Sequence, residues 1–135
     1  MTIVGRGILE EELKSIAKSN IKFIGFINNE EIGEIYQEHD VFVLPSTNEA
    51  WGLVVDEAIY WGLPIVVSNK VGASIDMVRE PRTGEIFDVD NIDSFNQAIY
   101  NVESNYDFYK QNVLSYSFEE RDRKQVDAYI KLLDN

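Results

Sequence analysis

The chain has 135 residues, of which 44% are hydrophobic, enough for one folded domain with a real core. Its net charge of −12 argues against nucleic acid as a partner, because such binding depends on Lys and Arg that neutralise phosphates. With no cysteine and one histidine, the sequence predicts no disulfide and no metal site, and it is compatible with the cytosol. A small anionic ligand stays open, since backbone amides at a helix N-terminus can hold a phosphate.

Short apolar or β-branched runs alternate with segments of helical spacing along the whole chain. The alternation predicts parallel βαβ units, and so an α/β fold with a Rossmann-like open parallel sheet flanked by helices. The continuous apolar runs "VFVLP" and "PIVVS" predict strands buried on both faces. Strands are expected at residues 2–4, 21–26, 41–45, 64–68 and 84–88, and helices at 9–20, 28–40, about 51–60, 72–80, 91–102 and 117–133.

In a sheet of this kind, ligands bind outside the carboxyl ends of the strands. The loop "STNEA" after the third strand places Glu49 at such an end, directly before a predicted helix. Gly52 allows a ligand to approach the backbone closely. The amides of Trp51, Gly52 and Leu53 are expected to point outward with partial positive charge. The loop therefore predicts a site for phosphate or sugar hydroxyls.

Glu57 follows Glu49 by eight positions, and this spacing alone leaves two interpretations open. The pair could line one ligand cleft, or it could be a capping carboxylate and a solvated helix residue. The apolar neighbours of Glu57 in "LVVDEAIYWGLPIVV" predict a desolvated carboxylate that needs hydrogen-bond donors. The later segment "NKVGAS" offers either a second anion contact through the Gly72 and Ala73 amides or a plain helix cap.

These motifs together resemble the nucleotide-sugar-binding half of retaining glycosyltransferases of family 4, which have the GT-B fold. The family pattern P-S-x-x-E-x-[FW]-G-L-x-x-x-E-A is followed by G-[LKT]-P, by G-x-x-x-[DE] and by T-G. The matching residues are Pro45, Ser46, Glu49, Trp51, Gly52, Leu53, Glu57 and Ala58, then Gly62, Leu63 and Pro64, then Gly72 and Asp76, then Thr83 and Gly84.

The resemblance implies a role for each matched residue. Glu49 would be the catalytic residue that faces the donor sugar, and Glu57 would hold the ribose hydroxyls. The amides of Trp51, Gly52 and Leu53 would bind the diphosphate and the sugar. The remaining donor-binding residues would be Gly5, Arg6, Gly25, Phe26, Ile27, Ile32 and Ser46, with Ile27 and Ile32 beside the base. Such enzymes need no metal or other cofactor and retain the anomeric configuration.

The resemblance also implies that residues 1–135 are a single fragment of the C-terminal domain. The N-terminal acceptor domain and the first part of the donor domain, with its Arg and Lys, would be absent. The reaction implied is transfer of a hexosyl unit from a UDP- or GDP-sugar to a glycan or lipid-linked acceptor, in cell-surface polysaccharide or glycolipid synthesis. The enzyme would be cytoplasmic, with peripheral association of the full-length protein at the inner membrane face left open. The fragment alone is expected to be inactive.

Two alternatives belong to other functional classes. A non-catalytic module that binds nucleotide sugars would keep the fold, and transfer by a full-length Glu49→Ala protein would distinguish it. A phosphoacceptor signalling domain would need acidic residues after the first strand, where this chain has Gly5-Arg6-Gly7. It would also need an aspartate after the third strand, where Pro45-Ser46 stand instead.

Overall fold

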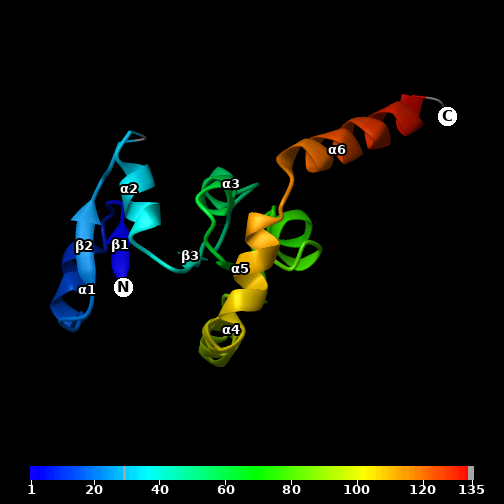
Figure 1. Cartoon of the computed structure of the whole chain (residues 1–135). Helices are drawn as coiled ribbons and strands as arrows, with labels where there is room; N and C mark the ends of the chain where they lie inside the picture. The colour runs from blue at the N-terminus through cyan, green and yellow to red at the C-terminus, as the bar shows by residue number, and fades with distance from the viewer. Residues whose placement is uncertain (29, 134–135) are drawn as a thin grey trace. The chain divides into compact units, whose positions relative to one another are not determined.

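The computed structural model describes residues 1–28 and 30–133, and the chain divides into two compact units. The N-terminal unit is Met1–Glu38 and the C-terminal unit is His39–Asn135. Figure 1 traces both along the chain from blue to red. That residues 1–135 form one domain stays a prediction. Position 29, inside the helix expected at 28–40, lies outside the described residues.

The N-terminal unit pairs β1 (Thr2–Val4) with β2 (Lys22–Gly25) in parallel. Its helices are α1 (Glu10–Ile16) and α2 (Ile32–Gln37). Three glutamates occupy the first turn of α1, where carboxylates favour the helix dipole, and Lys14 Nζ lies 2.8 Å from a Glu10 carboxylate oxygen. The helix is shorter than the predicted 9–20 because Ala17 is already extended, with φ −67° and ψ 139°.

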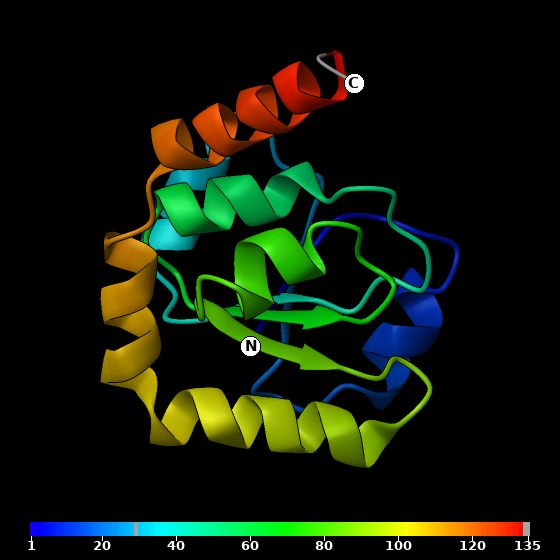
Figure 2. The ribbon, with the colours of Figure 1, turned by 90° about the vertical axis from the view of Figure 1, so that its right-hand side faces the viewer.

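The C-terminal unit contains a three-stranded parallel sheet in the order β3-β4-β5. Its helices are distributed over both faces: α3 and η1 lie on one side and α4 on the other (Figure 2). This confirms the predicted α/β class with parallel strands. The strands form two sheets rather than one, because no ladder joins β1 or β2 to β3 in the described residues. The elements are β3 (Phe42–Leu44), α3 (Leu53–Tyr60), β4 (Ile65–Ser68), the π-helix η1 (Ser74–Arg79), β5 (Gly84–Phe87), α4 (Ile92–Ser104), α5 (Tyr106–Leu114) and α6 (Phe118–Leu133).

Burial in the C-terminal unit is centred on β4, whose residues are all buried as predicted. The expectation that 41–45 is also buried on both faces is wrong, since β3 is an edge strand and its residues are only half-buried. One core cluster gathers where β4 and β5 meet α4 and α5: Val66, Phe87, Ala98, Val102 and Tyr109. Within the described residues, no helix is long and apolar enough to cross a membrane.

The helix α5 was not expected from the sequence. Its segment buries only Tyr109 and Val113, one turn apart, so the apolar periodicity that marks a helix is weak there. By contrast, α4 has a clear start, because the Asn91 side chain accepts hydrogen bonds from the amides of Asp93 (3.0 Å) and Ser94 (3.2 Å).

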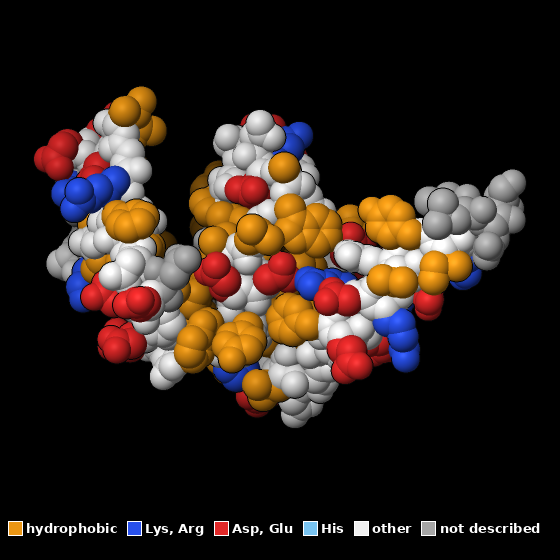
Figure 3. Space-filling view, turned by 90° about the horizontal axis from the view of Figure 1, so that it is seen from above, with side chains coloured by type: hydrophobic (Ala, Val, Ile, Leu, Met, Phe, Trp, Pro, Cys, Tyr) orange, Lys and Arg blue, Asp and Glu red, His pale blue; other side chains and the backbone are white. Residues whose placement is uncertain are grey.

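Acidic side chains lie in several separate groups among hydrophobic ones on the face drawn in Figure 3.

Candidate functional site

The Glu49 loop begins where β3 ends, at the carboxyl edge of the three-stranded sheet. The Glu49 amide donates to the Lys70 carbonyl (3.2 Å), and the Gly72 amide donates to the Glu49 carbonyl (2.9 Å). Glu49 and Val71 thereby form an isolated parallel bridge beyond the ends of β3 and β4. The loop is fixed by its backbone at the edge where ligands bind in parallel sheets.

Two further contacts hold the same loop. The hydroxyl of Ser68, the fully buried last residue of β4, donates to the Ser46 carbonyl and accepts from the Lys70 amide (3.2 Å). The Ala73 amide donates to the Trp51 carbonyl (2.9 Å). Ser46, predicted to contact the donor, is half-buried, and its carbonyl is used inside the protein.

Gly72 and Ala73 do not form the second anion contact that the sequence left open. Both amides point at carbonyls of the Glu49 loop, so neither is directed at a ligand. Gly72 is needed for a different reason: a Cβ at this position would lie 1.9 Å from the Ala50 carbonyl oxygen. The segment after β4 is therefore a support for the loop rather than a second binding element.

Helix α3 begins at Leu53, two residues later than expected, because Gly52 stands before it with φ +98° in the left-handed region. Trp51 and Gly52 therefore precede the helix, while the amides of Leu53 and Val54 in its first turn have no intrahelical acceptor. A Cβ built on Gly52 would lie 3.4 Å from Glu49 Cγ, so the half-buried Glu49 side chain runs beside the helix start. That these groups bind a donor stays a prediction.

Glu57 is exposed on α3. The expectation of a desolvated carboxylate is therefore wrong. The helix buries Val55, Ala58 and Ile59, which share one stripe at helical spacing, and turns Glu57 toward solvent. An exposed carboxylate remains accessible to ligand hydroxyls.

The other predicted donor contacts belong to the N-terminal unit, where three of them meet. The Gly5 amide donates to the Gly25 carbonyl (2.7 Å), and Arg6 Nε would be 3.2 Å from a Cβ at Gly25. These residues follow or end β1 and β2 at their carboxyl ends. In the turn after β2, Phe26 is 77% exposed, while Ile27 and Ile32, the first residue of α2, are half-buried.

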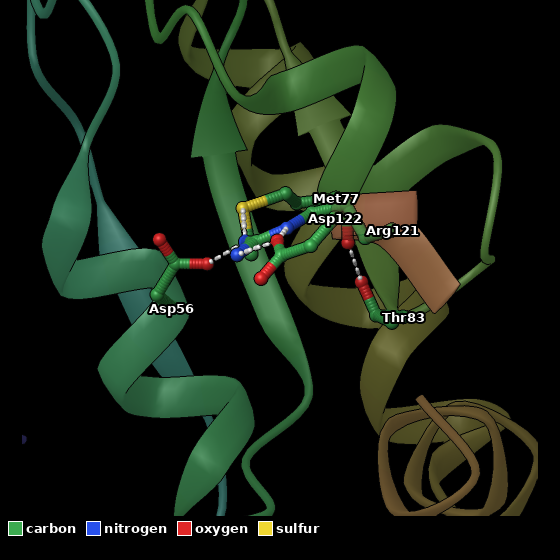
Figure 4. A network of polar contacts seen from close by, with 5 residues as sticks. All are labelled: Asp56, Met77, Thr83, Arg121 and Asp122. Carbon is green, nitrogen blue, oxygen red and sulfur yellow. Dashed lines mark hydrogen bonds and ion pairs between the residues drawn. The ribbon is translucent and has the colours of Figure 1, made fainter. Parts of the chain in front are cut away.

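Arg121 was not predicted from the sequence. Its Nη1 lies 2.5 Å from Asp56 Oδ1, and its Nη2 lies 2.9 Å from Asp122 Oδ1 (Figure 4). Burial alone would lower the pKa of Arg121, but its hydrogen bonds to Asp122 and its pairing with Asp56 raise it. Asp56 and Arg121 are 65 residues apart, so no local pattern signals their contact.

This ion pair borders a cavity of about 370 Å³ beside the start of α3, and Trp51, Leu53, Asp56, Arg121 and Gln125 line it. Arg121 and Gln125 belong to α6, so this helix lines the cavity together with the residues that precede and begin α3. In the described part of the chain, no group of three His, Asp or Glu side chains is arranged to hold a metal ion.

Residues 1–121 match the family model of glycosyl transferases group 1, so the chain belongs to this family. Over 106 residues it is 36% identical to a UDP-Gal:alpha-D-GlcNAc-diphosphoundecaprenol alpha-1,3-galactosyltransferase of Escherichia coli, covering 74% of this chain and 27% of that protein. Over 93 residues it is 30% identical to a GDP-mannose-dependent alpha-mannosyltransferase of Mycolicibacterium smegmatis, covering 69% of this chain and 24% of that protein.

The fold is similar to that of the crystal structure of WaaG, a glycosyltransferase involved in lipopolysaccharide biosynthesis. The TM-score is 0.69 at 20% identity, and the match covers 93% of this chain and 33% of that one. The fold is thus a Rossmann-like part of the GT-B architecture. The chain spans less than a third of the length of the curated relatives it matches.

Proposed function

We propose that this chain provides donor-binding residues of a retaining, family 4 glycosyltransferase that uses a UDP- or GDP-sugar. The observation that carries the proposal is the position of Glu49, whose backbone is bound to the 70–72 segment while its side chain runs beside the start of α3. A carboxylate beside free helix amides suits a molecule that joins hydroxyl groups to a diphosphate.

Each part of the C-terminal site has its own task in this proposal. Glu49 accepts hydrogen bonds from the donor sugar, and the amides of Leu53 and Val54 face the diphosphate. The exposed Glu57 accepts from the ribose hydroxyls. The bond between the sugar C1 and the diphosphate oxygen breaks, C1 joins the acceptor oxygen on the same face, and the acceptor proton passes to the leaving diphosphate. Fixed amide dipoles stabilise the negative charge that develops there.

The acceptor side of the proposal draws on the relatives. The E. coli relative's name describes a diphosphoundecaprenol acceptor, which supports a lipid-linked or glycan acceptor for this enzyme. The names of the two relatives contain UDP-Gal and GDP-mannose, so both bases remain in the proposal. We propose a cytoplasmic enzyme, with its acceptor bound by residues outside these 135 and no metal requirement. Binding of UDP that is equal in EDTA and in Mg²⁺ is the expected result for the last point.

Titration of the ¹⁵N-labelled chain with UDP, GDP, UDP-galactose and GDP-mannose tests the donor site. We expect amide shifts at Trp51 to Glu57, and the resemblance predicts separate shifts at Gly25 to Ile27 for the base. Glu49→Gln should weaken only the sugar nucleotides, because UDP and GDP offer it no hexose. Absence of shifts with all four ligands at millimolar concentration would reject donor binding by this chain.

The role of Glu57 has a sharper test in 2′-deoxy-UDP, which lacks one of the hydroxyls that Glu57 would hold. Glu57→Gln should weaken UDP several-fold and 2′-deoxy-UDP much less. Glu103→Gln is a suitable control, because Glu103 is also an exposed helix glutamate but lies on α4. Equal losses for the two nucleotides would place Glu57 away from the ribose.

A further inference from the structure

Among the described residues, four hydrogen bonds join the Glu49 loop to the last residue of β4 and the segment that follows it. Three of them are between backbone groups: Glu49 to Lys70, Gly72 to Glu49, and Ala73 to Trp51. The fourth is made by the Ser68 hydroxyl to the Ser46 carbonyl. Ser68 is the only side chain among these eight donors and acceptors.

Ser68 differs from an ordinary strand serine in its surroundings. It is fully buried, so its hydroxyl needs internal partners, and it has one on each side. It donates to Ser46 on the loop and accepts from Lys70, whose own carbonyl receives the Glu49 amide. One hydroxyl therefore fixes the first residue of the loop and the turn that binds Glu49.

We propose that Ser68 is a positioning residue for Glu49, and so a determinant of how the enzyme holds its donor sugar. The inference rests on the donor site proposed above. Ser68 touches no donor atom: it joins the first residue of the loop to the Lys70 turn, whose carbonyl accepts from the Glu49 amide. Loss of the hydroxyl leaves the Ser46 carbonyl and the Lys70 amide without their common partner, and the loop gains alternative positions.

The test compares Ser68→Ala and Ser68→Thr with Thr83→Val in the full chain. Thr83 is the matched control, because it is also fully buried and its hydroxyl also donates to a main-chain carbonyl, that of Met77 on η1 (Figure 4). Hydrogen exchange of the Glu49, Gly72 and Ala73 amides is measured against that of the β4 amides. Ser68→Ala should raise loop exchange roughly tenfold, as expected for one lost buried hydrogen bond, whereas Thr83→Val should leave it unchanged relative to β4.

Ligand affinity provides the readout that a purely structural residue would not change. The ratio of the Kd for UDP to that for UDP-galactose, and of GDP to GDP-mannose, measures what the sugar adds. A ratio above one means that the wild-type chain binds the sugar nucleotide more tightly than the diphosphate alone. For such a pair, Ser68→Ala should lower the ratio about tenfold, while the affinity for the nucleoside diphosphate alone stays within twofold. Ser68→Thr keeps the hydroxyl and should restore the ratio, and Thr83→Val should not alter it.

Loop exchange in Ser68→Ala equal to that in Thr83→Val would overturn the inference at its first step. If Ser68→Ala loosens the loop but leaves the ratio of the two Kd values unchanged, the inference fails at its second step. If the wild-type chain bound no nucleotide while Ser68→Ala still loosened the loop, the donor proposal would fail and Ser68 would be a structural residue only.

Discussion

Substitution of Gly72 by alanine should destabilise the C-terminal unit strongly. The backbone of Gly72 is not in the left-handed region, so the substitution causes no φ penalty. The obstacle is steric, since the new Cβ would lie 1.9 Å from the Ala50 carbonyl oxygen and 3.3 Å from Trp51 Cα. Both neighbours are backbone atoms, which cannot rotate away as the end of a flexible side chain can.

The expected cost follows from what must move. Relief of the overlap separates the loop from the 70–73 segment, which strains the packing by about 1–3 kcal/mol. The same movement breaks the Gly72-to-Glu49 and Ala73-to-Trp51 hydrogen bonds, each of which contributes about 0.5–1.5 kcal/mol. We therefore expect the free energy of unfolding to fall by about 2–6 kcal/mol, a large part of the roughly 5–15 kcal/mol of a typical domain.

Tryptophan fluorescence in a urea titration measures this effect in the right part of the chain. Both tryptophans, Trp51 and Trp61, belong to the C-terminal unit, so their emission reports its unfolding and not that of the N-terminal unit. The midpoint should fall while the slope of free energy against urea stays constant. A variant that is unfolded without urea agrees with the upper end of the expected range.

Gly62→Ala separates the steric effect from the general cost of replacing a glycine. Gly62 has φ +82°, but a Cβ there would meet only the ends of two flexible side chains, Leu114 Cδ2 and Lys110 Nζ, each at 3.4 Å. Its cost should be about 1–2 kcal/mol from backbone conformation alone. A Gly72→Ala protein as stable as the Gly62→Ala protein, or more stable, would refute the close approach of loop and support.

Three further predictions concern contacts outside the loop. Burial and the hydrogen bond to Glu85 raise the pKa of Tyr109 to about 12, so the folded state favours the neutral phenol and loses this stabilisation as pH rises from about 10 to 12. Across that window, wild-type protein should lose on the order of 2 kcal/mol more stability than Tyr109→Phe in urea titrations, and parallel curves would contradict this. A double-mutant cycle of Asp56→Asn and Arg121→Met should give a coupling free energy of about 1 kcal/mol. Because both side chains are about one-fifth exposed, 0.5 M NaCl should reduce this coupling. Additive effects of the two single substitutions would show that the ion pair does not contribute to stability. Asn91→Ala should lower the unfolding free energy by about 1 kcal/mol through loss of the α4 cap, and no loss would show that the cap does not contribute.

The fold class followed from the sequence because its signals are local. The apolar run at β4 is buried on all positions, and the caps and periodicity of α4 are contained in one segment. Burial of β3 could not be predicted in the same way, since an edge strand and a central strand have the same apolar composition. In α5, the exposed Phe108 and Leu114 stand beside the buried Tyr109 and Val113, so its apolar residues do not follow a single helical stripe.

The candidate site was predictable only as far as its position in the chain. Glu49 lies at the carboxyl end of a parallel strand and beside a helix start, as strand order and loop length implied. The exposure of Glu57 depends on which stripe of α3 faces the sheet, and its apolar neighbours concealed this. The Gly72 amide donates to Glu49, and Asp56 pairs with Arg121. Each contact joins residues far apart in the sequence, so neither has a local signal.

The loop and its support use different atoms for structure and for ligand binding. The backbone carbonyls of Ser46, Glu49 and Trp51 are occupied by Ser68 at the end of β4 and by the segment after it, whereas these residues do not use the Glu49 side chain or the first amides of α3. Lys70 contributes to the support through its backbone alone and has an exposed side chain, so substitution there should be tolerated. Ser68 and Gly72 contribute through a hydroxyl and through the absence of a Cβ, and these two positions should therefore tolerate the fewest alternatives in the support.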